Sequence, residues 1–247
     1  MKNVLITGGN RGIGLSITNQ LLEENYRILC IHKDKDKKLN VAGIEYYEYI
    51  CDVRNRTKLL NAILDFTLKY GNFWGVINNA GIAHAKPFEK ITTEEWDEIM
   101  DTNVKGVFNV CQFASPLLED KGRIINISSV SGLQGMSGHA HYCASKFALQ
   151  GLSQVLAKEL KGRRITVNTV NPGPTNTDMW KQLDKEYSEI NNWPEDMKQE
   201  DKYYDKLLIK RMGEPIDVAN VVSFLLKPES EYITGTHIKV CGGNLLG

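Results

Sequence analysis

The hydrophobic pattern of the chain alternates short apolar segments with longer amphipathic ones. The short segments are rich in branched and aromatic residues and predict strands at 3–7, 27–31, 46–50, 73–78, 123–128, 165–170 and 237–241. Several are apolar at consecutive positions, as strands are when both faces of a parallel sheet are covered. Helical periodicity lies between them, at 12–24, 55–70, 93–116, 141–161 and 215–226. The pattern predicts an α/β fold, a single-domain, doubly wound parallel sheet of about seven strands with helices on both faces.

One segment, residues 178–211, interrupts this alternation between the last two predicted strands. It is polar and aromatic, and its aromatic residues are Trp180, Tyr187, Trp193, Tyr203 and Tyr204. Long excursions inside compact domains are usually functional loops or disordered segments. We expect a substrate lid of one or two short helices here, with a plain structural excursion or a contact between subunits as the alternative.

The composition narrows the class of partner. The chain has 247 residues, with 30 Lys and Arg against 30 Asp and Glu, so nothing suggests nucleic acid or an anionic membrane as a partner. The densest charge run, KDKDKK at 33–38, alternates in sign and predicts a solvated loop. No apolar run is long enough for a signal peptide or a membrane span, and we expect a cytoplasmic protein.

The cysteines give no sign of a disulfide framework or a metal site. They are odd in number and widely scattered, without a CxxC pair, at Cys30, Cys51, Cys111, Cys143 and Cys241. We therefore expect small core or pocket residues in a reducing compartment, and no metal.

A glycine-rich turn follows the first predicted strand, in the sequence VLITGGNRGIG at 4–14. A strand, a glycine turn and the start of a helix near Gly12 let backbone N–H groups face a diphosphate. Glycine suits such a turn because a Cβ atom would obstruct the ligand or distort the turn. A tight turn without a ligand is the alternative for this motif taken alone.

A second group of residues suggests acid–base chemistry. Tyr142 and Lys146 are four residues apart on one predicted helix, so their side chains share a face. An ammonium beside a phenol should lower the pKa of the phenol toward the working pH. Ser129 ends a predicted strand, and strand ends of this topology meet at the ligand-binding crevice. A solvated Tyr and Lys on an amphipathic helix is the alternative, and Ser129 argues against it.

Six motifs in order resemble those of the short-chain dehydrogenases/reductases. They are TGGNRGIG at 7–14, NNAG at 78–81, Asn103, ISS at 127–129, YCASK at 142–146 and NPGPTNT at 171–177. The tail RMGEP…EYITGTHIKVCGG resembles the 3-oxoacyl-(acyl-carrier-protein) reductase branch. The resemblance implies one NADP-binding Rossmann domain over 1–247, assembled as a homotetramer or homodimer through its middle helices.

The resemblance also implies catalytic roles. Ser129 would bind the substrate oxygen, Tyr142 would exchange its proton, and Lys146 would tune the tyrosine and hold the nicotinamide ribose. Asn103 would complete the tetrad by holding a water in the proton relay. The predicted function is an NADP(H)-dependent oxidoreductase that transfers a hydride between nicotinamide and a carbonyl or secondary alcohol. A non-catalytic NADP-binding sensor or scaffold is the alternative, while the lack of a GxSxG elbow argues against a hydrolase.

Cofactor choice depends on the end of the second predicted strand. An Asp or Glu there binds the ribose hydroxyls of NAD, whereas a 2′-phosphate requires cations. That position is His32, followed by Lys33, and Arg11 adds a second cation, so we expect NADP(H); Asp34 would oppose this if the strand ended two residues later. The predicted cofactor-binding residues are Gly8, Asn10, Arg11, Gly12, Ile13, Gly14, His32, Lys33, Asp52, Val53, Asn79, Ala80, Gly81, Tyr142, Lys146, Pro172, Gly173, Thr175 and Thr177.

The resemblance implies a small-molecule carbonyl or alcohol as substrate, either a 3-oxoacyl thioester or a small biosynthetic ketone. By resemblance, the residues positioned to line its pocket are Ser131, Gln134, Met136, His139, Met179 and Trp180. A carrier-bound substrate would favour basic residues beside the entrance. Arg163 lies near one such position, whereas Glu119 and Asp120 occupy another, which speaks against an acidic carrier protein.

Overall fold

A parallel seven-stranded sheet, in the order β3-β2-β1-β4-β5-β6-β7, forms the centre of the molecule. The computed structural model describes residues 1–34, 45–194, 196–197 and 202–246. The strands are β1 Asn3–Thr7, β2 Arg27–His32, β3 Tyr46–Ile50, β4 Phe73–Asn78, β5 Leu118–Ile127, β6 Thr166–Pro172 and β7 His237–Val240. The strand order reverses between β1 and β4, so their carboxyl ends border a crevice where ligands bind in folds of this type.

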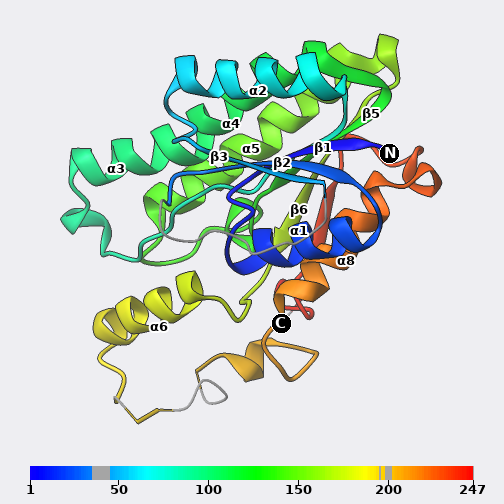
Figure 1. The fold of residues 1–247 in the computed structure, drawn as a ribbon. Helices are drawn as coiled ribbons and strands as arrows, with labels where there is room; N and C mark the ends of the chain where they lie inside the picture. Colours follow the sequence, from blue (N-terminus) through cyan, green and yellow to red (C-terminus); the bar gives the residue numbers. More distant parts are fainter. Residues whose placement is uncertain (35–44, 195, 198–201, 247) are drawn as a thin grey trace.

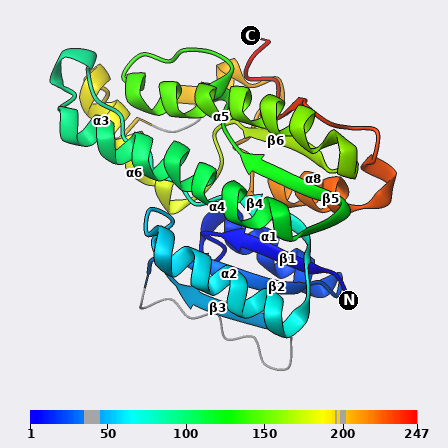
Figure 2. The ribbon, with the colours of Figure 1, turned by 90° about the horizontal axis from the view of Figure 1, so that it is seen from above.

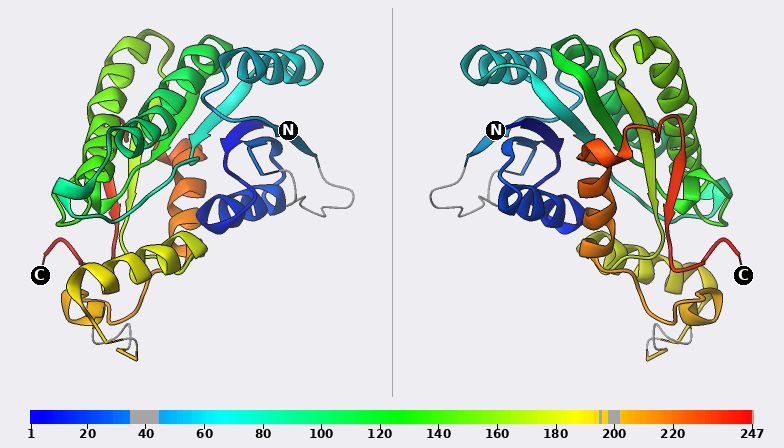
Figure 3. Two further views of the ribbon diagram at one scale, coloured as in Figure 1. Left: turned by 90° about the vertical axis from the view of Figure 1, so that its left-hand side faces the viewer. Right: turned by 90° about the vertical axis from the view of Figure 1, so that its right-hand side faces the viewer.

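Helices cover both faces of the sheet (Figure 1). They are α1 Gly12–Glu23, α2 Arg56–Tyr70, α3 Thr93–Met100, α4 Gly106–Ala114, α5 Ala140–Glu159, α6 Asp178–Asn191 and α8 Pro215–Leu226. Helices α2, α4 and α5 lie in front of the sheet in Figure 2, and α1 and α8 lie behind it. The side views of Figure 3 show α6 apart from both layers, beyond one edge of the sheet. This is the doubly wound Rossmann architecture that the sequence predicts.

Each layer of helices buries its own hydrophobic core against the sheet. On one face, Leu59 and Phe66 of α2 pack with Val110 of α4 and Leu149 of α5. On the other, Leu21 of α1 packs with residues of α8, including Val222. The apolar runs of the inner strands are buried because both faces are covered.

Most predicted elements are confirmed to within a few residues, and the two larger differences are within 93–116 and at the start of β5. The segment 93–116 is helical, but it is not α-helical throughout: a π-helical turn at Asp101–Lys105 lies between α3 and α4. The turn buries Thr102 and Asn103, and such turns are frequent at functional sites. Thr92 caps α3 and forms a capping box with Glu95.

Strand β5 also begins earlier than predicted. Leu118 pairs with Phe73, and the register then shifts between Phe73 and Gly75 before regular pairing resumes at Arg123. The polar residues at 119–121 concealed this irregular start from the hydrophobic pattern. Within the described ranges, no helix has the length and apolar character needed to cross a bilayer.

Two predicted features extend beyond the described residues. The charge run at 33–38 is described only at Lys33 and Asp34. The segment 178–211 contains α6 and a second described part from Lys202 onward, while positions 195 and 198–201 lie outside the description.

Candidate active site

A pocket of about 750 Å³ lies at the carboxyl edge of the sheet. Its walls come from the turn after β1, the segments after β4, β5 and β6, and α6. Every site residue predicted from the sequence lines this pocket except Asn103. The structure therefore brings into one cavity residues that are up to about 170 positions apart in the chain, because parallel strands end at the same edge.

The glycine turn has the backbone conformation that the sequence predicts. Gly8 and Gly12 have φ values of +65° and +52°, a region that disfavours a side chain. A Cβ atom on Gly14 would lie only 2.1 Å from the carbonyl oxygen of Gly8. Helix α1 begins at Gly12, so its first N–H groups open toward the pocket. These features fit a bound diphosphate, because both the backbone donors and the space that a side chain would fill are present.

The segment after β4 braces this turn. The hydroxyl of Thr7 accepts hydrogen bonds from the backbone N–H groups of Asn79 and Ala80, at 3.1 and 3.0 Å. The side-chain amide of Asn79 donates to the carbonyl of Gly8 at 2.9 Å. The NNAG motif thus fixes the shape of the turn from the neighbouring strand.

Charged residues gather where β2 ends. Arg11 and Asp34 form an ion pair at 3.7 Å, and their side chains are 46% and 34% exposed. Lys33 is exposed beside them. His32, the last residue of β2, is buried, and its Nε2 lies 2.8 Å from the Glu48 carboxylate on β3. The carboxylate that could oppose a 2′-phosphate is therefore Asp34, already partnered with one of the two predicted cations.

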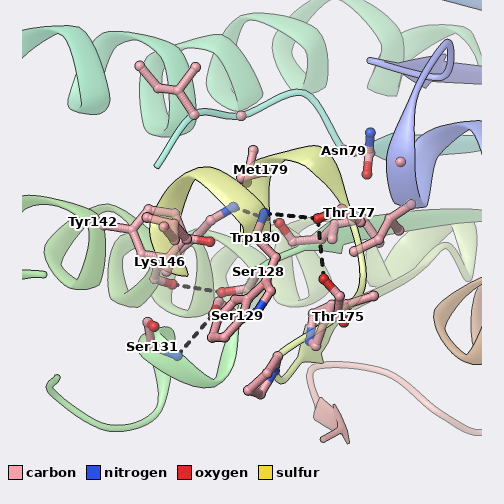
Figure 4. A pocket seen from close by; sticks show the side chains of 18 of the residues that line it. Asn79, Ser128, Ser129, Ser131, Tyr142, Lys146, Thr175, Thr177, Met179 and Trp180 are labelled. Carbon is pink, nitrogen blue, oxygen red and sulfur yellow. Dashed lines mark hydrogen bonds between the residues drawn. The ribbon is translucent and has the colours of Figure 1, made fainter. Parts of the chain in front are cut away.

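Three of the four predicted catalytic side chains, Ser129, Tyr142 and Lys146, converge in the pocket (Figure 4). Ser129 follows β5 and accepts a hydrogen bond from the N–H of Ser131 at 3.1 Å. Tyr142 and Lys146 lie on the first two turns of α5, and both are buried. The Lys146 ammonium donates to the carbonyl of Ile127 at 3.0 Å, which ties the helix to the end of β5.

The predicted lowering of the Tyr142 pKa is wrong for this structure. Burial raises the pKa of Tyr142 to about 12, and a hydrogen bond with Ser129 offsets only part of that effect. The ammonium of Lys146 lies 5.6 Å from the centre of the tyrosine ring and faces the Ile127 carbonyl. Burial lowers the pKa of Lys146 itself to about 8. Desolvation therefore outweighs the attraction between the two groups.

Asn103 lies behind the pocket wall. Its side-chain oxygen accepts from the N–H of Ile82 at 2.9 Å, and its amide donates to the carbonyl of Ile82 at 2.9 Å and to the hydroxyl of Ser145 at 3.1 Å. The π-helical turn places it there, next to Gly81, whose Cβ position would be 3.1 Å from the Asn103 oxygen. In this arrangement Asn103 fixes the segment after β4 to α5.

Helix α6 covers the other end of the pocket with an apolar face. Leu183, Tyr187 and Ile190 line the pocket at helical spacing, while Lys181 and Lys185 on the opposite face are exposed. The predicted substrate contacts Met179 and Trp180 lie on its first turn. The helical period of the apolar residues in 178–191 is the signal that would have identified the inner face from the sequence.

Two neighbouring residues of α6 tie it to loops on the pocket wall. The Glu186 carboxylate accepts from the N–H of Ala85 at 2.6 Å. The phenol of Tyr187 lies 3.0 Å from Nδ1 of His139, which is 3% exposed. His139 was predicted to bind substrate; it lines the pocket, but its ring is already engaged with Tyr187. The loops themselves are joined, because the N–H of Lys86 donates to the carbonyl of Gly138 at 2.7 Å.

Comparison with known proteins identifies the family. A family model described as short chain dehydrogenase matches residues 2–188. The chain is 36% identical, over 251 aligned residues and 98% of both chains, to a 3-oxoacyl-[acyl-carrier-protein] reductase FabG of Staphylococcus epidermidis. It is 35% identical to an L-2,3-butanediol dehydrogenase of Corynebacterium glutamicum, with 99% of this chain and 98% of that protein covered. The solved structure of a blue fluorescent protein from a metagenomic library, in complex with NADPH, matches with a TM-score of 0.87 and 31% identity, covering 98% of this chain and 97% of that one. The chain belongs to the short-chain dehydrogenase/reductase family of oxidoreductases.

Proposed function

We propose that the protein is an NADP(H)-dependent oxidoreductase that transfers a hydride between nicotinamide and a carbonyl or secondary alcohol substrate. The observation that carries this proposal is the convergence of Ser129, Tyr142 and Lys146 in a pocket whose other end is the glycine turn. A proton donor, a hydrogen-bonding hydroxyl and a nucleotide site in one cavity meet the requirements of carbonyl reduction.

The chain's own residues handle the substrate oxygen and its proton. A bound nicotinamide cofactor supplies or accepts the hydride. The hydroxyl of Ser129 can donate a hydrogen bond to the substrate oxygen, and the phenol of Tyr142 can transfer its proton to it. Because its pKa is about 12, Tyr142 is protonated near neutral pH and is suited to proton donation.

Lys146 supplies the positive charge of the site. With a pKa of about 8 it is mostly protonated at pH 7, and it is held at the end of β5 by the Ile127 carbonyl. From there its ammonium can hold the nicotinamide ribose and stabilise the negative charge that develops on Tyr142 when its proton leaves. Asn103 acts by positioning, since its amide fixes the segment that precedes Ile82.

We propose NADP(H) over NAD(H) as the cofactor. Arg11 and Lys33 flank the mouth of the pocket where β2 ends, and both are cationic. A 2′-phosphate would compete with Asp34 for Arg11, and two negative charges on the phosphate favour the exchange. The similarity to a protein solved with NADPH supports the same choice.

Delivery of substrate by an acidic carrier protein receives little support from Arg163. Arg163 lies just before β6, at the amino edge of the sheet and so on the side away from the pocket. It forms an ion pair with Asp120 at 3.0 Å and donates to the carbonyl of Ser115. Arg163, the basic residue expected from the sequence to favour a carrier protein, is therefore neutralised by Asp120 and lies far from the pocket.

The middle helices offer a surface for assembly. Phe108 on α4 is 44% exposed, and Phe147 and Val155 on α5 are 46% and 50% exposed. Phe147, Gly151 and Val155 follow one another at helical spacing along α5. We propose a homotetramer or homodimer formed through this face, and a cytoplasmic location consistent with five free cysteines.

A turnover screen tests the proposed reaction. Ketones and 3-oxoacyl thioesters, with and without carrier protein, are offered with NADPH and with NADH, and the loss of reduced cofactor is followed by absorbance. We expect turnover with NADPH that Tyr142→Phe abolishes, while the Kd for NADPH changes by no more than about twofold. Tight NADPH binding with no turnover on any member of the panel would instead support a sensor or scaffold.

A further inference from the structure

We infer that the pocket selects uncharged ketones that carry an aromatic substituent, bound against α6 and the aromatic residues Trp193 and Tyr203. This inference rests on the proposed function, because it assigns the substrate class of the same site. In the reaction the carbonyl carbon would accept the hydride of NADPH, the oxygen would accept the Tyr142 proton, and NADPH would be oxidised to NADP⁺.

The first observation is an apolar wall in contact with the proton donor. Tyr142 belongs to a hydrophobic cluster with Leu183 of α6, and Trp180, Tyr187 and Ile190 pack against the same cluster. All of these side chains line the pocket. A carbonyl group placed at Tyr142 must therefore direct one of its substituents along this apolar surface.

The second observation is that the aromatic part of the wall is held in place from behind. The ring of Tyr203 makes edge contacts with Trp180 and Trp193, with centroids 5.1 and 5.8 Å apart. The phenol of Tyr203 donates to the Asp184 carboxylate at 2.7 Å. Lys202, whose side chain is 5% exposed, pairs with the same carboxylate at 3.4 Å. The aromatic rings are thus positioned before a ligand arrives, which lowers the entropic cost of binding one.

The charged residues around α6 disfavour a substrate with an anionic substituent. Apart from the catalytic Lys146, the charged residues of the described chain that line the pocket around α6 are Asp178 and Lys206. The Asp178 side chain is 73% exposed, and Lys206 is also exposed. A carboxylate placed along the α6 wall, away from Lys146, would lose its hydration without gaining a buried cation, which is costly. The apolar part of the pocket therefore favours a neutral group.

Geometry favours a ring over a flexible chain. Trp180, Trp193 and Tyr203 offer flat faces and edges to the pocket, and aromatic pairs gain stabilisation beyond the burial of their area. A linear acyl chain would gain only the burial and would lose more rotational freedom on binding. We therefore expect a phenyl group to be preferred over both a methyl group and a short acyl chain.

A matched set of substrates tests this inference. Diacetyl, 1-phenyl-1,2-propanedione and phenylglyoxylate differ by one group at a time: phenyl replaces methyl, and then a carboxylate replaces the acetyl group. With NADPH in excess, we expect kcat/KM for the phenyl diketone to exceed the values for diacetyl and phenylglyoxylate by about tenfold or more. Acetoacetyl thioester is included, and we expect it to be a poorer substrate than the phenyl diketone.

Variants locate the preference on the proposed wall. Trp180→Ala should reduce kcat/KM for the phenyl diketone by about tenfold, and should lower it by more than it lowers kcat/KM for diacetyl. Trp180→Phe keeps a ring and should retain most of the preference even if the alanine variant folds poorly. Trp96→Ala is the control, because Trp96 is a half-exposed tryptophan of α3 that does not line the pocket.

Calorimetric binding to Tyr142→Phe in the presence of NADPH separates this inference from the proposed function. Tighter binding of the phenyl diketone than of diacetyl, without turnover by the unmodified protein, would uphold the aromatic site and overturn the oxidoreductase proposal. Equal or better turnover of diacetyl, phenylglyoxylate or acetoacetyl thioester would overturn the aromatic site and leave the oxidoreductase proposal standing.

Discussion

The phenol oxygen of Tyr187 lies 3.0 Å from Nδ1 and 3.1 Å from Nε2 of His139, so a hydrogen bond joins α6 to the residue at the N-cap position of α5. The ring centroids of His139 and Tyr187 are 4.9 Å apart, and the His139 ring makes an edge contact with Tyr142 at a centroid distance of 5.2 Å. The position of α6 over the pocket is therefore linked, through the buried His139, to the surroundings of Tyr142, the proposed proton donor.

Removing the Tyr187 hydroxyl should loosen this link without disturbing the nucleotide site. In Tyr187→Phe, His139 loses a buried partner, and we expect the free energy of unfolding to fall by about 1–2 kcal/mol. The KM for the ketone should rise by about fivefold while the Kd for NADPH stays unchanged. Steady-state kinetics and cofactor titration measure both effects. Tyr232→Phe, at a fully exposed tyrosine, is the matched control. A loss of stability with an unchanged KM would show that the bond has only a structural role.

The buried His139 should also make stability depend on pH. Burial lowers the pKa of His139 to about 4 from an ordinary value of 6.5. Between these values the unfolded chain binds a proton that the folded chain does not, so the free energy of unfolding must fall as the pH falls from 6.5 to 4. The effect amounts to at most about 3 kcal/mol.

Denaturant unfolding at several pH values measures this dependence. His139→Gln should remove much of the slope below pH 6.5, whereas His84→Gln, at a histidine with a 45% exposed side chain, should retain most of it. An unchanged slope in His139→Gln would assign the acid sensitivity to other groups, of which His141 is the nearest buried candidate.

The sequence predicted the fold and most of the pocket because both follow from local rules. The runs of apolar residues marked the strands, and parallel strands must end at one edge, so Gly8, Asn79 and Ser129 had to meet there. The spacing of Tyr142 and Lys146 placed both on one helix face without reference to the rest of the chain.

The remaining features depend on contacts between distant parts of the chain. Asn103, which the π-helical turn buries, is hydrogen-bonded to the backbone of Ile82, 21 residues earlier. The pKa of Tyr142 follows from how completely other elements cover it, which spacing alone does not reveal. The ion pair of Arg11 with Asp34 joins two loops. The sequence shows that both residues are charged, but it does not show that they pair.

That ion pair predicts how cofactor preference should respond to mutation. Asp34→Asn removes a carboxylate that competes with a 2′-phosphate for Arg11, so the Kd for NADPH should fall by about threefold or more. Arg11→Ala should weaken NADPH binding by about tenfold and affect NADH much less. Fluorescence titration with both cofactors provides the ratios. Asp65→Asn makes an equal change of charge at an exposed position on α2 and controls for the effect of the protein's net charge on cofactor binding. Parallel changes for NADPH and NADH would place the 2′-phosphate elsewhere.

The glycine turn should tolerate no side chain at Gly14. In Gly14→Ala the new Cβ atom would meet the Gly8 carbonyl oxygen at 2.1 Å and the Asn79 amide nitrogen at 2.4 Å. We expect cofactor binding to be lost and the free energy of unfolding to fall by about 1–3 kcal/mol. Gly162→Ala is the control, because a Cβ atom there would meet nothing within 4 Å. Normal NADPH affinity in Gly14→Ala would mean that the turn can move and that its shape is not what binds the cofactor.

The two ends of the pocket should therefore differ in how well they tolerate amino-acid substitutions. The turn at Gly8 and Gly14 is fixed by backbone atoms in close contact, whereas α6 is joined to the pocket wall by side chains such as Glu186 and Tyr187. Substitutions in α6 can reshape the substrate wall one residue at a time while the nucleotide turn stays as it is. On this scaffold we expect single mutations to give access to new substrate specificities, and we expect a change of hydride donor to require substitutions among the few charges where β2 ends.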